Sequence, residues 1–341
     1  MRAVVLVDKR KLEVKEIESP VSKNGEVMIE ILKCGICGSD LHNFEAGEPK
    51  GLVMGHEFCG SVLDPGSRTD LKVGDIVTAL PISPCGHCGA CESGNPQYCK
   101  QTWNDAVGLS LTRPGALTKK ICVRPDMVFK VPNTVTPDEM AMVEPTAVAL
   151  HAVHLANIKL GDKVLVIGGG IIGLLSAMLA KKEGASYVAV SETNPHRGEK
   201  AMKLGVADKY YDATNQAMIE EVMKDTTDGF DIVIECCGNA PAVTSSFVTV
   251  RPGGTVVLVG VATSAISVPT VLAVMNELTV QGAIAYTKEE FATCIEMIAT
   301  KQIDVMPFVD DIVSFDQVQE AYERLTSGTD RAVKILVDPT L

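Results

Sequence analysis

Four cysteines within fifteen positions constrain this chain more than any other feature of it. They are Cys85, Cys88, Cys91 and Cys99, separated by two, two and seven residues. Two-residue gaps let successive thiolates curl round one ion. An iron–sulfur cluster is the rival interpretation, but in the ferredoxin pattern the fourth cysteine follows after three residues and precedes proline. Here it follows after seven and precedes Lys100. The spacing therefore favours a closed zinc site that stabilises the fold.

Composition excludes several classes of protein. The chain has 341 residues, enough for two domains, and a formal net charge of −12. Nucleic acids and anionic membranes attract basic surfaces, so neither is expected as a partner. The longest apolar stretch, 164–180, is short for a bilayer span and holds four glycines, so it predicts a buried strand, turn and helix. The N-terminus lacks the apolar core of a signal peptide, and metal ligation plus buried thiols accounts for the eleven cysteines. We expect a reducing cytoplasm.

The pattern of apolar residues changes part-way along the chain. The first 145 or so residues predict a β-rich region, with short strands at 2–7, 26–32 and 75–80. From about Gly161, apolar strands at 163–167, 187–190, 209–211, 230–235 and 255–259 alternate with helices at 171–183, 195–204 and 215–224. This alternation predicts an α/β fold with a parallel sheet. The tail, with helices at 288–300 and 315–326 and a strand at 332–337, is expected to return to the N-terminal domain.

A glycine run lies between the first of these strands and its helix. The run is Gly168-Gly169-Gly170-Ile171-Ile172-Gly173. In this strand–turn–helix context it predicts a dinucleotide-binding turn. Gly168 permits the turn, Gly170 lets the backbone approach the pyrophosphate, and Gly173 lets helix and strand pack closely. The amides of the helix N-terminus, including those of Ile171 and Ile172, then face the phosphates.

Glu192 predicts which dinucleotide binds. It lies nineteen residues past Gly173, just after the next strand. An acid at this place bonds both ribose hydroxyls of NAD and repels the extra phosphate of NADP. The alternative is an ordinary exposed acid. Arg197 follows within five residues and is expected along the adenine or the adjacent surface; a contact with a 2′-phosphate is the weaker interpretation.

The segments Gly35-Ile-Cys37-Gly-Ser39-Asp40 and Gly55-His56-Glu57 lie upstream of the cysteine lobe. A lone Cys or His is usually a packed residue, but the order of these segments and the downstream lobe changes that interpretation. With EPTAVALHAV at 144–153 and the glycine run, they resemble the zinc-containing medium-chain dehydrogenase/reductase family. The resemblance is to its polyol (sorbitol) and 2,3-butanediol dehydrogenase branch and covers nearly the whole chain.

The resemblance implies a second, open zinc site. Cys37 and His56 resemble zinc ligands, and Glu57 adjoins the metal as an alternate ligand or as a carboxylate just behind it. Glu144 occupies the place of a ligand that is cysteine in alcohol-specific members and glutamate in polyol-type members. The alternative for Glu144 is a solvated acid in the first turn of a helix. An open zinc would act as a Lewis acid that lowers the pKa of a substrate hydroxyl.

A proton relay follows from the same resemblance. Ser39 is expected to take the proton of the alcohol and His42 to pass it outward. The alternative for Ser39 is a cap on a helix that begins near Asp40. Asp40 is expected to orient a ligand histidine.

The resemblance implies the architecture and the reaction. A GroES-like β-rich catalytic domain would comprise 1–146 and 288–341, and a Rossmann doubly wound parallel-sheet domain 147–287. The cofactors would be one catalytic zinc, one structural zinc and NAD. The reaction would be oxidation of a secondary alcohol, a polyol or vicinal diol, to a ketone by a cytoplasmic homotetramer or homodimer.

Alternatives stay open within and outside the family. A threonine-type dehydrogenase shares the scaffold, although that branch tends to carry aspartate at position 144. A structural lens protein or a zinc-free reductase would lack the ligands present here. Short loops at 41–54 and 61–73 depart from the family. A phosphorylated polyol becomes an alternative substrate if Lys50, Lys119 or Lys120 faces the cleft.

Overall fold

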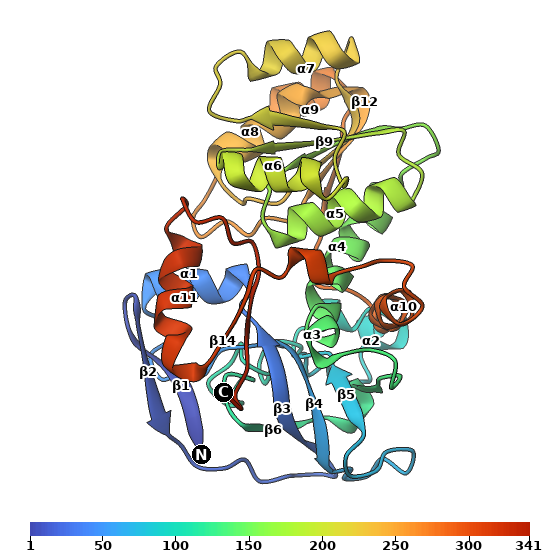
Figure 1. Ribbon diagram of the computed structural model, residues 1–341. Helices are drawn as coiled ribbons and strands as arrows, with labels where there is room; N and C mark the ends of the chain where they lie inside the picture. The colour runs from blue at the N-terminus through green and yellow to red at the C-terminus, as the bar shows by residue number, and fades with distance from the viewer. The chain divides into compact units, whose positions relative to one another are not determined.

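Six strands in the middle of the chain form one parallel sheet (Figure 1). Their order across the sheet is β10 (Lys209–Asp212), β9 (Tyr187–Glu192), β8 (Lys163–Ile167), β11 (Phe230–Glu235), β12 (Val250–Leu258) and β13 (Thr279–Gly282). Numbered along the chain this order is 3-2-1-4-5-6, the doubly wound order of the Rossmann fold. Ligands of such sheets bind beyond the carboxyl ends of the strands, near the point where the order reverses.

Helices connect these strands, as parallel pairing requires. They are α5 (Ile171–Lys182), α6 (Pro195–Lys203), α7 (Met218–Thr226), α8 (Ala240–Thr249) and α9 (Thr270–Met275). The central strands β8, β9 and β11 are almost continuously buried, as expected where both faces of a sheet are covered. Phe230, Val233 and Phe247 belong to the core that β11 and α8 form, and each is fully or almost fully buried.

The predicted elements of this region differ from the observed ones in detail. The helix expected at 215–224 begins at Met218 and ends at Thr226. The strand expected at 255–259 begins five residues earlier, at Val250, and its pairing with β11 contains an irregularity. The helix α8, which joins β11 to β12, is not among the predicted elements.

A second, mostly antiparallel sheet is built from both ends of the chain. Its order is β14 (Asp311–Val313), β15 (Ile335–Val337), β3 (Val27–Gly35), β4 (Glu57–Asp64), β5 (Ile76–Ala79) and β7 (Val128–Lys130), and β6 (Lys120–Val123) also pairs with β3. The strands β1 (Arg2–Asp8) and β2 (Lys11–Glu16) form a separate antiparallel pair. The antiparallel pairing of β15 with β3 brings the C-terminal tail beside the first third of the chain.

The helices of this second region come from both segments of the chain. They are α1 (Gly38–Ala46), α2 (Gly89–Glu92), α3 (Pro137–Met140), α10 (Lys288–Ala299) and α11 (Val318–Thr326), with 3-10 turns at Pro96–Tyr98, Pro125–Met127, Met306–Phe308 and Phe315–Gln317. The helix α4 (Val143–Ala156) begins in this region and continues past Pro145 into the part of the chain that carries the parallel sheet. Figure 1 shows α1 beside α11, and Phe44 of α1 meets Tyr322 of α11 edge to face at 5.3 Å.

The computed structural model describes residues 1–341 and divides them into two units. Unit 1 comprises Met1–Pro145 and Tyr286–Leu341, and unit 2 comprises Thr146–Ala285. The chain therefore passes from one unit to the other twice, once after Pro145 and once before Tyr286. No helix in either unit has the length and apolar character needed to cross a membrane.

Candidate zinc and dinucleotide sites

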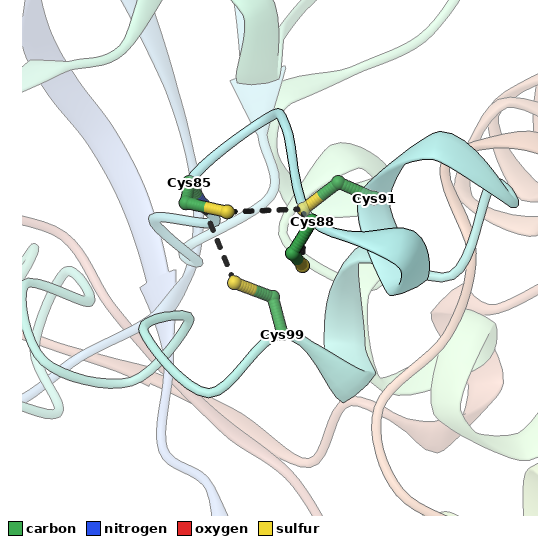
Figure 2. Close-up of side chains that lie close together, drawn as sticks. All are labelled: Cys85, Cys88, Cys91 and Cys99. Carbon is green, nitrogen blue, oxygen red and sulfur yellow. Dashed lines mark hydrogen bonds between the residues drawn. The ribbon is translucent and has the colours of Figure 1, made fainter.

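The four cysteines of the lobe face one another (Figure 2). Their sulfur atoms all lie within 4.8 Å of one another. The Sγ atom of Cys91 lies 3.6 Å from that of Cys88 and 3.9 Å from that of Cys85. These distances exclude disulfides, whose sulfurs are about 2 Å apart.

The lobe fits a single tetrahedral ion. Four thiolates at the usual zinc–sulfur distance lie about 3.8 Å from one another. A multi-iron cluster would spread its cysteines further, because each thiolate binds a different iron. The backbone amides of Cys85 and Gln101 donate to Cys99 Sγ at 3.3 and 3.4 Å and lower the pKa of this thiol to about 6, which favours the thiolate that zinc needs.

Ser39 contacts two residues of the predicted open site. Its Oγ is 3.3 Å from Cys37 Sγ and 3.4 Å from His56 Nε2. Cys37 is the residue just before α1, and His56 is the residue just before β4. The structure thus brings together three of the residues singled out in two separate sequence segments. Cys37, His56, Glu57 and Glu144 do not form a set as tight as the four cysteines.

Asp40 lies on the other side of the imidazole of His56. Its Oδ1 lies 3.6 Å from His56 Nδ1, and both residues are buried. Burial disfavours the charged imidazole, but the negative charges of Cys37 and Asp40 outweigh it and raise the pKa of His56 well above the ordinary value. An acid behind Nδ1 leaves Nε2 as the ligand atom, a common arrangement around zinc.

Glu57 forms an ion pair that the sequence analysis did not anticipate. Its Oε2 accepts a hydrogen bond from the ammonium of Lys334, and both side chains are buried. Lys334 also donates to the carbonyl oxygen of Ile36 at 3.0 Å. Glu57 Oε1 is buried and has no hydrogen-bond partner in the protein. A buried carboxylate oxygen without a hydrogen-bond partner in the protein is suited to be a metal ligand.

Glu144 has a partner of a different kind. It lies in the first turn of α4, as the helix-start interpretation requires, but it is 8% exposed and therefore not solvated. Its Oε1 accepts a hydrogen bond of 2.9 Å from the hydroxyl of Tyr286. Burial raises the pKa of Glu144 to about 7 against the opposing charge of His56. Tyr286, like Lys334, was missed because it is distant in sequence from the residue it contacts.

The two residues of the predicted relay lie on α1. Ser39 is the second residue of this helix, and the cap is Cys37, whose amide donates to Asp40 Oδ2 at 3.3 Å. The alternative role of Ser39 as a helix cap is therefore wrong, because the helix begins two residues earlier than that role assumed. His42 lies three residues further along, on the same side of the helix, and is exposed.

The glycine run forms a tight turn between β8 and α5. Gly168 has a φ of +107°, which favours glycine. A Cβ on Gly173 would collide with the carbonyl oxygen of Gly168, so close packing requires glycine there as well. A Cβ on Gly170 would meet nothing within 4 Å. The protein itself leaves that space open, which fits a cradle for a pyrophosphate.

Glu192 ends β9 beside this turn and is buried, so it is not an ordinary exposed acid. Its Oε2 accepts from the amide of Gly169 at 2.6 Å, and its Oε1 accepts from the amides of Thr193 and Asn194 at 2.6 and 2.8 Å. These bonds fix the carboxylate against the glycine turn. Arg197 lies close by, because a Cβ on Gly169 would be 3.3 Å from Arg197 Cβ.

Comparison with known proteins identifies the family. The model described as "Alcohol dehydrogenase GroES-like domain" matches residues 23–133, and the model described as "Zinc-binding dehydrogenase" matches residues 172–300. Sorbitol dehydrogenase of Bacillus subtilis is 32% identical to the chain and covers 99% of it, over 97% of its own length. The chain belongs to the zinc-containing alcohol dehydrogenase family. The predicted fold class, a GroES-like domain with a Rossmann-type domain, is confirmed.

Two further similar proteins differ from sorbitol dehydrogenase in the substrate or the cofactor that their names give. L-threonine 3-dehydrogenase of Rhizobium rhizogenes is also 32% identical, over 94% of this chain and 93% of its own. A solved zinc-binding dehydrogenase from Sinorhizobium meliloti 1021, bound to NADP, shares 30% identity and a TM-score of 0.89, and the match covers 99% of both chains. The protein is thus a zinc-dependent oxidoreductase of the alcohol and polyol dehydrogenase type, with a fold that binds NAD or NADP.

Proposed function

We propose that the protein catalyses the reversible oxidation of a secondary hydroxyl of a polyol or vicinal diol to a ketone, with NAD as the oxidant. One observation carries this proposal. The hydroxyl of Ser39 lies within 3.4 Å of the candidate ligand atoms of both Cys37 and His56. A proton-accepting hydroxyl next to a metal site suits removal of a proton from an alcohol.

We assign Cys37, His56, Glu57 and Glu144 to the open zinc site and the four cysteines to the closed one. When bound, zinc supplies Lewis acidity towards the substrate hydroxyl, and NAD supplies a hydride acceptor. The unpartnered Oε1 of Glu57 supports its role as a donor. Asp40, whose Oδ1 lies 3.6 Å from His56 Nδ1, would orient this imidazole when zinc is bound.

The proton leaves by way of α1. Ser39 takes the proton of the substrate hydroxyl, and His42, one turn along and exposed, passes it to solvent. Ser39 and His42 are three residues apart on α1, so the relay would use one face of this helix.

NAD is the proposed cofactor, although one related structure holds NADP. The carboxylate of Glu192 is anchored beside Gly169 by backbone amides. A fixed negative charge there accepts hydrogen bonds from ribose hydroxyls and repels a 2′-phosphate. Arg197 Cβ also lies near the turn, and a guanidinium that reached a 2′-phosphate would oppose this preference.

A polyol is favoured over an amino alcohol by the glutamate at position 144 and by the likeness to sorbitol dehydrogenase. The equal identity to L-threonine 3-dehydrogenase supports an amino alcohol as the second candidate. A polyol phosphate has less support. Lys50 is paired with Asp8 at 2.9 Å, Lys119 is exposed, and Lys120 lies opposite Glu30 on β3.

Steady-state kinetics over a substrate panel test this function. The zinc-loaded protein is assayed with NAD and with polyols, vicinal diols, threonine, polyol phosphates and ethanol. We expect the highest kcat/KM for a polyol or a diol. A higher kcat/KM for threonine would identify an amino alcohol as the substrate. A higher kcat/KM for ethanol would contradict the proposed substrate class.

We also propose that the protein is a homo-oligomer joined through unit 2. The strand β13 is at the edge of the parallel sheet and pairs only with β12. Exposed apolar side chains gather on it and on α9; they are Val271, Val274, Met275 and Val280, with Val274 and Met275 75% and 76% exposed. An apolar edge of this kind is usually covered in a stable protein. A second copy of the chain would pair with β13 and cover it.

The mass of the protein in solution tests this assembly. Val280→Lys on the edge strand should convert a dimer or tetramer into smaller species. Val73→Lys is the control, because Val73 is 69% exposed in unit 1 and should tolerate the change. A monomeric wild-type protein would contradict the proposal.

The proposed compartment is the cytoplasm. All eleven cysteines are free. The thiolates of both zinc sites have to stay reduced to bind metal, which a reducing compartment ensures.

A further inference from the structure

Tyr286 is a buried tyrosine whose hydroxyl donates a hydrogen bond to Glu144. It donates to Glu144 Oε1 at 2.9 Å, and the side chain is 1% exposed. Phenols keep their proton at neutral pH, so this hydroxyl is a donor and the carboxylate is the acceptor. Tyr286 therefore engages one of the two oxygens of Glu144 and leaves the other available.

The ring of Tyr286 is held in place by aromatic packing. It stacks on Phe291 of α10, with ring centroids 5.5 Å apart, and Phe291 packs on Phe129 of β7 at 5.3 Å. The next residue, Thr287, caps α10 through reciprocal hydrogen bonds with Glu290. Ring and backbone are thus both fixed, so the hydroxyl presents one direction to Glu144.

We propose that Tyr286 is a positioning residue for the open zinc site. It acts through Glu144 by fixing the orientation of the carboxylate. The second carboxylate oxygen is then oriented for the metal before zinc binds. This inference rests on the proposed assignment of Glu144 to that site. Partners that orient a metal-binding carboxylate commonly change metal affinity or activity 10- to 100-fold when they are removed.

The position of this hydrogen bond in the chain adds to its importance. Glu144 is one residue before the point at which the chain leaves unit 1, and Tyr286 is the residue at which it returns. The bond therefore joins the two segments of unit 1 at their ends. A single hydroxyl orders the site and ties these ends together.

Tyr286→Phe is the direct test, because it removes the hydroxyl and keeps the ring that packs on Phe291. Zinc affinity is measured by competition with a chelator. We expect the dissociation constant of the open site to rise about 10- to 100-fold. The cysteine lobe serves as an internal control, and its zinc should dissociate as in the wild type. The visible spectrum of cobalt substituted at the open site should change, which a loss of stability alone would not cause.

Tyr211→Phe is the matched control. Tyr211 is a fully buried tyrosine of unit 2, and its hydroxyl also donates to a carboxylate, Asp225 Oδ2 at 2.9 Å. Its removal should leave zinc affinity and the cobalt spectrum unchanged. If Tyr286→Phe matches this control in zinc affinity, cobalt spectrum and kcat/KM, the positioning role is overturned.

A double variant separates this inference from the proposed function. On a Glu144→Ala background the hydroxyl has no carboxylate to orient, so Tyr286→Phe should cause no further loss of zinc affinity. A full additional loss would show that Tyr286 acts otherwise than through Glu144. None of these metal measurements requires turnover, so they stand even if no alcohol in the panel reduces NAD.

Discussion

The ammonium of Lys334 forms a buried ion pair with Glu57, a residue 277 positions earlier in the chain. Lys334 and Glu57 are both 0% exposed, so solvent does not screen the attraction between their charges. Gly35 makes this possible, because a Cβ there would collide with both side chains. The C-terminal tail thereby supplies the counter-charge for a carboxylate next to the candidate zinc ligand His56.

Lys334→Met should destabilise the zinc-free protein by about 3–5 kcal/mol, because it leaves a buried carboxylate without a counter-charge. Denaturant unfolding measures this loss. Adding Glu57→Gln to Lys334→Met should recover most of it, because the remaining amide carries no charge.

Lys33→Met is the matched control for that experiment. Lys33 pairs with Asp338 at 2.6 Å elsewhere in the same unit, so its loss should also destabilise the protein. Glu57→Gln should not rescue this variant. Equal rescue of both lysine variants would contradict a specific pairing of Lys334 with Glu57.

Substitutions at the two zinc sites should have different effects. Cys88→Ser should mainly impair folding, because a closed thiolate site contributes folding free energy. Cys37→Ser should abolish turnover while leaving a folded protein that still binds the dinucleotide. Metal analysis should give two zinc ions per wild-type chain and one per Cys37→Ser chain. One zinc in the wild type would contradict this assignment.

Zinc affinity at the open site should fall as the pH is lowered from about 8 to about 6, because the metal displaces protons from its ligands. The pKa of Glu144 is about 7, above its unfolded value of 4.5, and the pKa of His56 is raised as well. Each group therefore loses its proton at a higher pH in the folded, zinc-free protein than in the unfolded chain. The zinc-free protein should therefore lose stability as the pH rises through this window.

Glu144→Gln is the control for the pH dependence. It removes one of the two titrating groups and should flatten the zinc affinity profile between about pH 6 and about pH 8. Chelator competition at several pH values measures both profiles. Identical profiles for the variant and the wild type would show that Glu144 does not titrate with zinc binding.

Glu192→Gln should narrow the preference for NAD over NADP. Loss of the charge next to Gly169 should change the ratio of kcat/KM by about 1–3 kcal/mol, on the order of five- to 150-fold. Arg197→Met on the same background should then lower the use of NADP, if the guanidinium meets the 2′-phosphate. A wild-type protein that prefers NADP would refute the role of Glu192.

Local sequence patterns were enough to predict the parallel-sheet region. The strand 163–167 and the start of the helix at Ile171 agree with the observed elements, because a continuous apolar run and a glycine turn depend on neighbouring residues only. The helix α8 was omitted although Asn239 caps it, with its side chain accepting from the amide of Ala242, and proline follows in the first turn. That cap was the available signal.

Contacts between distant segments could not be predicted in the same way. Lys334 and Tyr286 reach Glu57 and Glu144 across 277 and 142 residues. Nothing near either residue in the sequence indicates a partner, because the pairing of β15 with β3 and the packing of α10 bring them there. The resemblance to a family supplied the candidate ligands, whereas the groups that hold those ligands appear only in the folded chain.

Titration of activity with zinc tests the central claim most directly. The starting protein carries zinc in the cysteine lobe only, and NAD reduction by a polyol is followed as zinc is added. We predict that activity rises in proportion to occupancy and reaches its maximum at one additional zinc per chain, while Cys37→Ser stays inactive throughout. Full activity before the second zinc binds, or an active Cys37→Ser protein, would contradict the account.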